Sequence, residues 1–148
     1  MYALNTLSVR RATLDDDISI AALWRNAWAS ANRWATEIAP VEHWLERVRA
    51  EFRAPKDVVL SLDEQGEING FMVIDLLRGY VDQLFIDPAH QGHGLGGALL
   101  DLACERMPHG WTLISGFDQE GNESERVQDI CDEKGRLRGE ILLNNDGK

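Results

Sequence analysis

The spacing of apolar residues in the first part of the chain predicts a strand followed by two helices. Alternation over residues 7–10 indicates the strand, and the acidic stretch 13–17 is typical of a helix start. The first helix is expected to bury an apolar side made of Ile20, Leu23, Trp24, Ala27, Trp28 and Ala31. The second should open at Pro40, end by Pro55 and carry the stripe Val41, Trp44, Leu45, Val48 and Phe52.

Strand patterns dominate the middle of the chain. Residues 58–62 and 68–76 read as an antiparallel hairpin joined by the turn 63–66, and residues 80–86 read as a third long strand. A helix is then expected from about Gly94 to residue 107, followed by a strand at 111–115. This order predicts one α/β domain with a mixed sheet, spanning residues 1–148.

Composition restricts the class of partner. The chain has 148 residues, of which 44% are hydrophobic, and a formal charge of -10. An acidic surface repels phosphate backbones, so nucleic-acid binding is disfavoured, whereas cationic partners such as amines are attracted. No apolar run approaches the length of a membrane span, and the N-terminus lacks the layout of a secretory signal. We therefore expect no membrane association and a cytoplasmic location.

The two cysteines, Cys104 and Cys131, show no metal-ligand spacing and no nearby histidine cluster. A zinc site is therefore not expected, and the predicted metal content is none. A disulfide is also not expected, because two isolated cysteines are typical of proteins from a reducing compartment.

The segment 91–97 reads QGHGLGG and lies between a strand-like and a helix-like run. Unpaired N–H groups converge at a helix start, and glycines let the backbone approach a bulky anion. A pyrophosphate suits this arrangement. The Lys-Ser/Thr pair of a Walker A loop is missing, since Ala98 and Leu99 follow. The glycines also match GxGxxG, but in mid-chain after antiparallel strands, so this spacing alone is a weak indication of a dinucleotide fold.

The whole stretch 84–100 resembles the acyl-CoA-binding motif of the GNAT acetyltransferase superfamily. It combines a Leu84–Ile86 strand end, Asp87-Pro88, a Gln-x-x-Gly-x-Gly segment and an amphipathic helix. The resemblance extends over residues 7–117. It implies a GNAT-like fold: a mixed, mostly antiparallel central sheet with a splayed parallel strand pair, flanked by helices.

The resemblance also implies a site for acetyl-CoA. Backbone amides of the glycine segment would hold the pyrophosphate, and the edge of the preceding strand would pair with the pantetheine arm. The implied cofactor-binding residues are Leu84, Phe85, Ile86, Gln91, Gly92, His93, Gly94, Leu95, Gly96, Gly97 and Ser124.

Acetyl transfer to an amine needs a base, because a lysine-like amine has a pKa of about 10.4. Asp82 is one candidate, and it is expected on the opposite strand face from Gln83. Glu37 is another, because the family builds acceptor pockets between its first two helices, where Trp34 is a candidate lining residue. Both acids have the alternative of being ordinary solvated groups. Direct transfer is usual in the family, and the strand backbone would bind the oxyanion.

Many family members protonate the leaving thiolate with a tyrosine after the fifth strand. Aligning this chain on Ser124 puts Cys131 at that position on a short helix, whereas aligning on Asn122 breaks the apolar spacing. Cys131 is therefore a candidate proton donor, with a small buried residue as the alternative. Only residues 137–143 can form a later strand, where the family commonly has two. A homodimer would complete that short sheet.

The resemblance, together with these residues, predicts an N-acetyltransferase that moves acetyl from acetyl-CoA to a primary amine of a small molecule, peptide or protein. The divergent C-terminal segment leaves open an acyl-CoA-binding or regulatory domain with little transfer. An interaction module with a vestigial loop is a third alternative.

Overall fold

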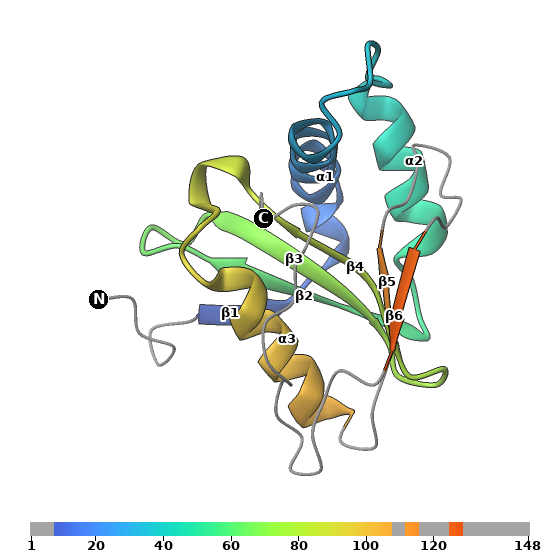
Figure 1. The fold of residues 1–148 in the computed structure, drawn as a ribbon, viewed down its shortest axis with the longest axis vertical. Helices are drawn as coiled ribbons and strands as arrows, with labels where there is room; N and C mark the ends of the chain where they lie inside the picture. The colour runs from blue at the N-terminus through green and yellow to red at the C-terminus, as the bar shows by residue number, and fades with distance from the viewer. Residues whose placement is uncertain (1–7, 108–111, 116–124, 129–148) are drawn as a thin grey trace.

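The computed structural model describes residues 8–107, 112–115 and 125–128, and these form an α/β fold around one twisted sheet (Figure 1). Six strands follow one another across the sheet in chain order: β1 Ser8–Arg11, β2 Lys56–Leu62, β3 Ile68–Asp75, β4 Tyr80–Ile86, β5 Thr112–Ser115 and β6 Glu125–Gln128. The three long helices are α1 Asp17–Ala31, α2 Val41–Glu51 and α3 Leu95–Arg106. Short 3-10 turns, η2 Leu14–Asp16 and η3 Pro88–His90, precede α1 and follow β4.

All neighbouring strands are antiparallel except β4 and β5, which run parallel. The expected mixed, mostly antiparallel sheet with one parallel pair is therefore confirmed. The three predicted helices are also confirmed. Helix α2 begins directly after Pro40 and ends before Pro55, and α3 ends at Arg106, next to the expected end at residue 107. Strand β6 was not expected: residues 125–128 pair with β5. The short helix expected around Cys131 lies outside the described residues.

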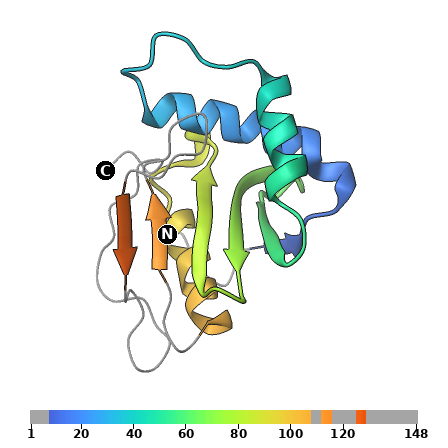
Figure 2. The same cartoon turned by 90° about the vertical axis from the view of Figure 1, so that its right-hand side faces the viewer.

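Two apolar layers fill the two faces of the sheet. Alternate strand residues such as Met72 and Leu84 pack against α3, and the residues between them, such as Phe71, pack against α1 and α2. Figures 1 and 2 show this division, with α3 on one face and the α1–α2 pair on the other. Trp24, Trp28 and Trp44 are at most 2% exposed, which confirms them as core residues. No helix in the described ranges is long and apolar enough to cross a bilayer.

The start of α1 is fixed to β1 by an ion pair. Arg10 donates from Nη1 and Nη2 to the two carboxylate oxygens of Asp16, each at 2.9 Å. The backbone N–H of Thr13 donates to the same carboxylate at 2.8 Å. These hydrogen bonds favour the charged form and lower the pKa of Asp16 to about 2.

Replacing Asp16 with Asn is expected to lower the free energy of unfolding by about 1–2 kcal/mol at pH 7. Arg10 is 42% exposed at its side chain, and solvent screening holds the effect to that range. A carboxyl whose pKa is depressed in the folded state stabilises above its unfolded pKa and stops doing so as the pH falls towards 2. The difference between variant and wild type, measured by urea unfolding, should therefore shrink below pH 4. A constant difference between pH 7 and pH 3 would contradict this.

Candidate active site

The loop between β4 and α3 has a backbone that needs its glycines. Gly92 and Gly94 have φ of 84° and 80°, in the left-handed region that other residues rarely adopt. Gly94 is the N-cap of α3, and the side chain of Gln91 donates to the carbonyl of Ile86 at 3.2 Å. The loop is thus tied to the end of β4 and turns directly into the helix.

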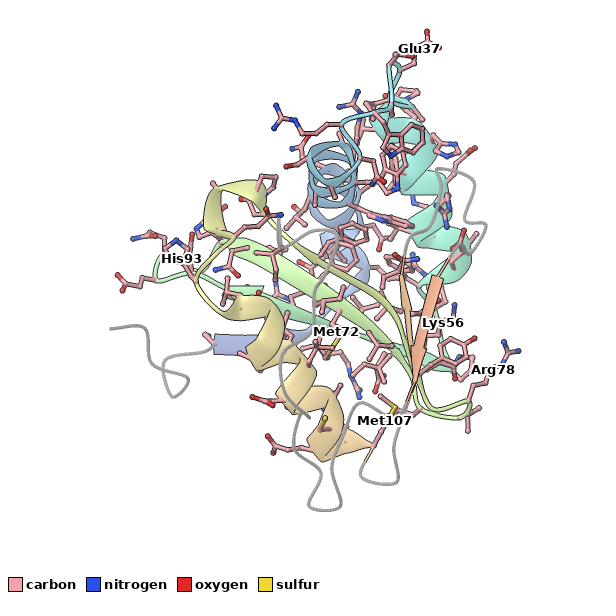
Figure 3. All side chains as sticks on the ribbon, viewed as in Figure 1. Glu37, Lys56, Met72, Arg78, His93 and Met107 are labelled. Atoms are coloured by element: carbon pink, nitrogen blue, oxygen red, sulfur yellow. The ribbon has the colours of Figure 1, made fainter. Side chains whose placement is uncertain are left out.

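The first turn of α3 is open to an approaching anion. A methyl group built on Gly92, Gly94 or Gly97 would meet no atom within 4 Å. The first backbone bond within the turn is donated by Ala98 to Gly94 at 3.0 Å, so the N–H groups before Ala98 have no carbonyl of the helix to bind. Leu95 is buried and anchors the turn, whereas His93 is exposed and lies at the outer side of the loop (Figure 3). The geometry suits a pyrophosphate at the positive end of the helix dipole.

Strands β4 and β5 share a ladder only at their beginnings. Tyr80 pairs with Thr112 and Val81 with Leu113, but β4 continues to Ile86 while the rest of β5 pairs only with β6. Leu84, Phe85 and Ile86 are buried along this part of β4. The divergence confirms the expected splay, and we call the space between the two strands beyond Val81 the β4–β5 wedge.

A bulge marks the point where the wedge begins. Along β3 and β4, Val73 pairs with Gln83 whereas the next residue, Ile74, pairs with Val81. Asp82 is therefore the extra residue of a β-bulge, a feature that often re-aims a side chain next to an active site. The bulge places Asp82 at the apex of the wedge.

The bulge also corrects an expectation about side-chain direction. Strict alternation predicted Asp82 and Gln83 on opposite faces, but Asp82 contacts Lys56, which shares the α1–α2 face with Val58. Gln83 lies opposite Val73 on the same face. The inserted residue breaks the period of two, so both polar side chains point towards α1 and α2.

Asp82 is held by a short ion pair. Its Oδ2 lies 2.6 Å from Nζ of Lys56, and the two side chains are 14% and 23% exposed. The sequence pattern of β4 gives no indication of Lys56, because this lysine comes from the start of β2.

The connection between α1 and α2 passes above the end of the sheet towards which β4 and β5 point (Figure 2). Arg25 Nε and Trp44 Nε1 both donate to the carbonyl of Ala39, at 2.7 and 3.1 Å, and fix the connection to the helices. Trp34 is 72% exposed there, and its ring makes a T-shaped contact with that of Trp28, with centroids 6.0 Å apart. The family's acceptor pocket was expected in this region.

The structure does not bring the two candidate bases together. Glu37 is exposed at the outer end of the α1–α2 connection, whereas Lys56, the partner of Asp82, lies well away from it (Figure 3). Glu37 and Asp82 therefore stay alternative predictions for the base.

The cysteines differ from expectation. Cys104 on α3 is fully buried and is disulfide-bonded, so the prediction that the chain carries no disulfide is wrong. A pairing of cysteines depends on their distance in the fold, which spacing along a sequence does not disclose. Cys131, the other cysteine, lies outside the described residues, as does Ser124. The described residues hold no group of three or more side chains suited to a metal ion.

The disulfide leads to a direct prediction. If both cysteines of the chain are oxidised, the unfolded protein should take up no iodoacetamide before reduction and should take up label on both after reduction, as measured by mass spectrometry. The protein should also migrate as a monomer on a non-reducing gel. This result would remove the thiol that the hypothesis of Cys131 as a proton donor requires, whereas two alkylated cysteines without reductant would contradict the disulfide.

Comparison with known proteins agrees with this geometry. The profile of the Acetyltransferase (GNAT) family matches residues 21–116. The chain belongs to the GNAT acetyltransferase family. Like other members, it is an acetyl-CoA-dependent acyltransferase.

Three GNAT relatives illustrate the similarity. The peptidyl-lysine N-acetyltransferase YjaB of Salmonella typhimurium is 28% identical over 118 residues, which cover 79% of this chain and 73% of YjaB. A GCN5-related N-acetyltransferase from Rhodopseudomonas palustris superposes with a TM-score of 0.61 at 17% identity, over 77% of this chain and 75% of that one. A phosphinothricin acetyltransferase from Sinorhizobium meliloti in complex with acetyl-CoA superposes with a TM-score of 0.56 at 22% identity, over 74% and 64%. The two structural similarities concern the fold alone.

Proposed function

We propose that this chain transfers an acetyl group from acetyl-CoA to a primary amine of a small molecule, peptide or protein by direct attack. The observation that carries the proposal is the junction of β4, its bulge and α3. At this junction the open start of α3, which is lined by glycines, follows strand β4. The edge of β4 separates from β5 at Asp82. Family membership and the acetyl-CoA complex of the Sinorhizobium meliloti protein support acetyl-CoA as the co-substrate.

In this proposal the loop residues hold the cofactor. The N–H groups of residues 92–97 would bind the pyrophosphate, and Gln91 would keep the loop in place through Ile86. The part of β4 from Leu84 to Ile86 would border the pantetheine arm in the wedge. When bound, acetyl-CoA supplies an activated thioester carbonyl.

Asp82 would receive the proton of the acceptor ammonium, directly or through water. The neutral amine would then attack the thioester carbon, and backbone N–H groups of β4 next to the bulge would stabilise the oxyanion. The acid for the departing thiolate is not assigned among the described residues. A primary amine as acceptor agrees with the net charge of the chain and with the lysine named for YjaB.

A second candidate function is acyl-CoA binding with weak or no transfer. The ion pair favours it, because Lys56 already occupies Oδ2 of the only acid that the bulge presents. Free-thiol release from acetyl-CoA, followed across a panel of a lysine peptide, a polyamine and free amino acids, separates the two. Amine-dependent release supports the transferase. Stabilisation of the protein by acetyl-CoA without any release supports the binding domain.

Three further properties stay predictions: residues 1–148 form one domain, the protein is located in the cytoplasm, and it forms a homodimer. Light scattering on the purified chain tests the last of these, and a mass twice that of one chain is the expected result.

A further inference from the structure

Lys56 is a primary amine placed at the candidate base. Its Nζ is 2.6 Å from Oδ2 of Asp82, and among the residues that the structure describes it is the one lysine. The sequence holds two others, Lys134 and Lys148, both outside the described ranges. For direct proton transfer the ammonium of an acceptor has to contact this carboxylate, and the ammonium of Lys56 already does so.

The contact is selective. In the sheet register Lys56 lies beside Asp75, whose carboxylate accepts from the backbone N–H of Arg78 at 3.0 Å and lies 3.9 Å from the Arg78 side chain. Lys56 passes over this nearer acid and extends across β3 to the bulge on β4. The lysine therefore points at the apex of the wedge.

Lys56 is also accessible enough to react. Its side chain is 23% exposed. Lys56 also borders a cavity of about 240 Å³ whose lining does not include Asp82, and the other charged groups there are Arg11, Asp17, Arg53 and Asp57. Arg11 pairs with Asp57, and Arg53 pairs with Asp17. The charges around Lys56 are thus already paired with one another, and Asp82 is the acid left to take its proton.

We propose that Lys56 is an internal acetyl acceptor, so that the chain acetylates itself at this residue. This inference rests on the proposed function. Asp82 takes one proton from the ammonium, and neutral Nζ attacks the thioester carbon. The C–N bond forms, the C–S bond breaks, and CoA thiolate leaves and takes up a proton released from the new amide nitrogen. The products are Nε-acetyl-Lys56, CoA thiol and one proton, which Asp82 passes to solvent.

Holding the amine at the reacting carboxylate turns a bimolecular reaction into an intramolecular one. Labelling of Lys56 should therefore be first order in protein and at least about tenfold faster than chemical acetylation of Lys134 and Lys148 in the same molecules. The experiment uses the full chain with carbon-13-labelled acetyl-CoA and no added amine, followed by tryptic mapping. Trypsin cuts after Arg53 and Arg78, so acetylation replaces the fragment 57–78 with the fragment 54–78.

Matched variants make the test specific. Lys56→Arg keeps the positive charge and should keep stabilisation by acetyl-CoA, but the fragment should carry no label. Gly94→Glu should reduce labelling of Lys56 to the background of the other lysines. Gly66→Glu, at a left-handed glycine of the β2–β3 turn, should leave it unchanged.

Two results would overturn the inference: labelling of Lys56 no faster than that of Lys134 and Lys148, or a rate constant that rises with protein concentration. If acetyl-CoA stabilises the chain and external amines are acetylated while Lys56 stays unlabelled, the proposed function stands and this inference falls. If acetyl-CoA neither stabilises the chain nor reacts, both fall.

Discussion

Replacing Asp82 with Asn is expected to lower kcat for acetylation of an amine by about 100- to 10,000-fold, the usual contribution of a positioned base. Asn keeps the size of the side chain and the bulge but cannot accept the proton of an ammonium. Because Asp82 does not lie in the loop that would hold the pyrophosphate, KM for acetyl-CoA should change little. Thiol release under saturating amine, measured from pH 6 to pH 9, gives both constants.

Asp57→Asn is the matched control. Asp57 is likewise a partly buried acid on a strand in an ion pair, with Arg11 at 3.3 Å, but it pairs with Ile74 in the register and does not lie at the bulge. It should retain wild-type kcat. Equal losses in the two variants would mean that removal of a carboxylate acts through folding. Full activity in Asp82→Asn would remove Asp82 from the mechanism.

Replacing Gly94 with Glu should weaken the binding of acetyl-CoA by at least about 100-fold, which corresponds to about 2.7 kcal/mol. A side chain at φ of 80° strains the N-cap by about 1–2 kcal/mol. The new carboxylate would stand where the pyrophosphate is expected, and two anions would repel one another at short range. Calorimetric titration with acetyl-CoA measures the loss.

Gly66→Glu separates backbone strain from the loss of the site. Gly66 has a φ of 82° and open space around it, like Gly94, but it lies in the turn between β2 and β3. Both variants should lose a similar amount of stability against urea, and only Gly94→Glu should lose acetyl-CoA. Retained binding in Gly94→Glu would place the pyrophosphate elsewhere.

The sequence predicted the parts of this fold that depend on local spacing. The stripe with Trp24 and Trp28 has a helical period, and the hairpin around residues 63–66 has a turn composition, so both could be located. The loop at 91–97 could be located for the same reason, because the conformations of Gly92 and Gly94 are local requirements of its backbone. Its role in binding acetyl-CoA stays a prediction.

The parts that depend on contacts between distant segments were missed. A one-residue bulge at Asp82 leaves no trace in the alternation of β4, yet it decides the direction in which the acid points. The ion pair to Lys56 joins residues 26 positions apart, and the oxidation of Cys104 depends on where its partner lies in space. Strand β6 was missed because the residues that make it are polar at three of four positions.

The placement of acetyl-CoA in the loop and the wedge is tested by titration of the chain with acetyl-CoA, followed in the amide proton–nitrogen correlation spectrum. The largest shifts should fall on the amides of residues 92–97 and on those of β4 from Gln83 to Ile86. Amides of the β2–β3 turn around Gly66 should not move. Shifts confined to other segments, such as the start of α1 and the end of α2, would contradict the placement of the cofactor in the loop and the wedge.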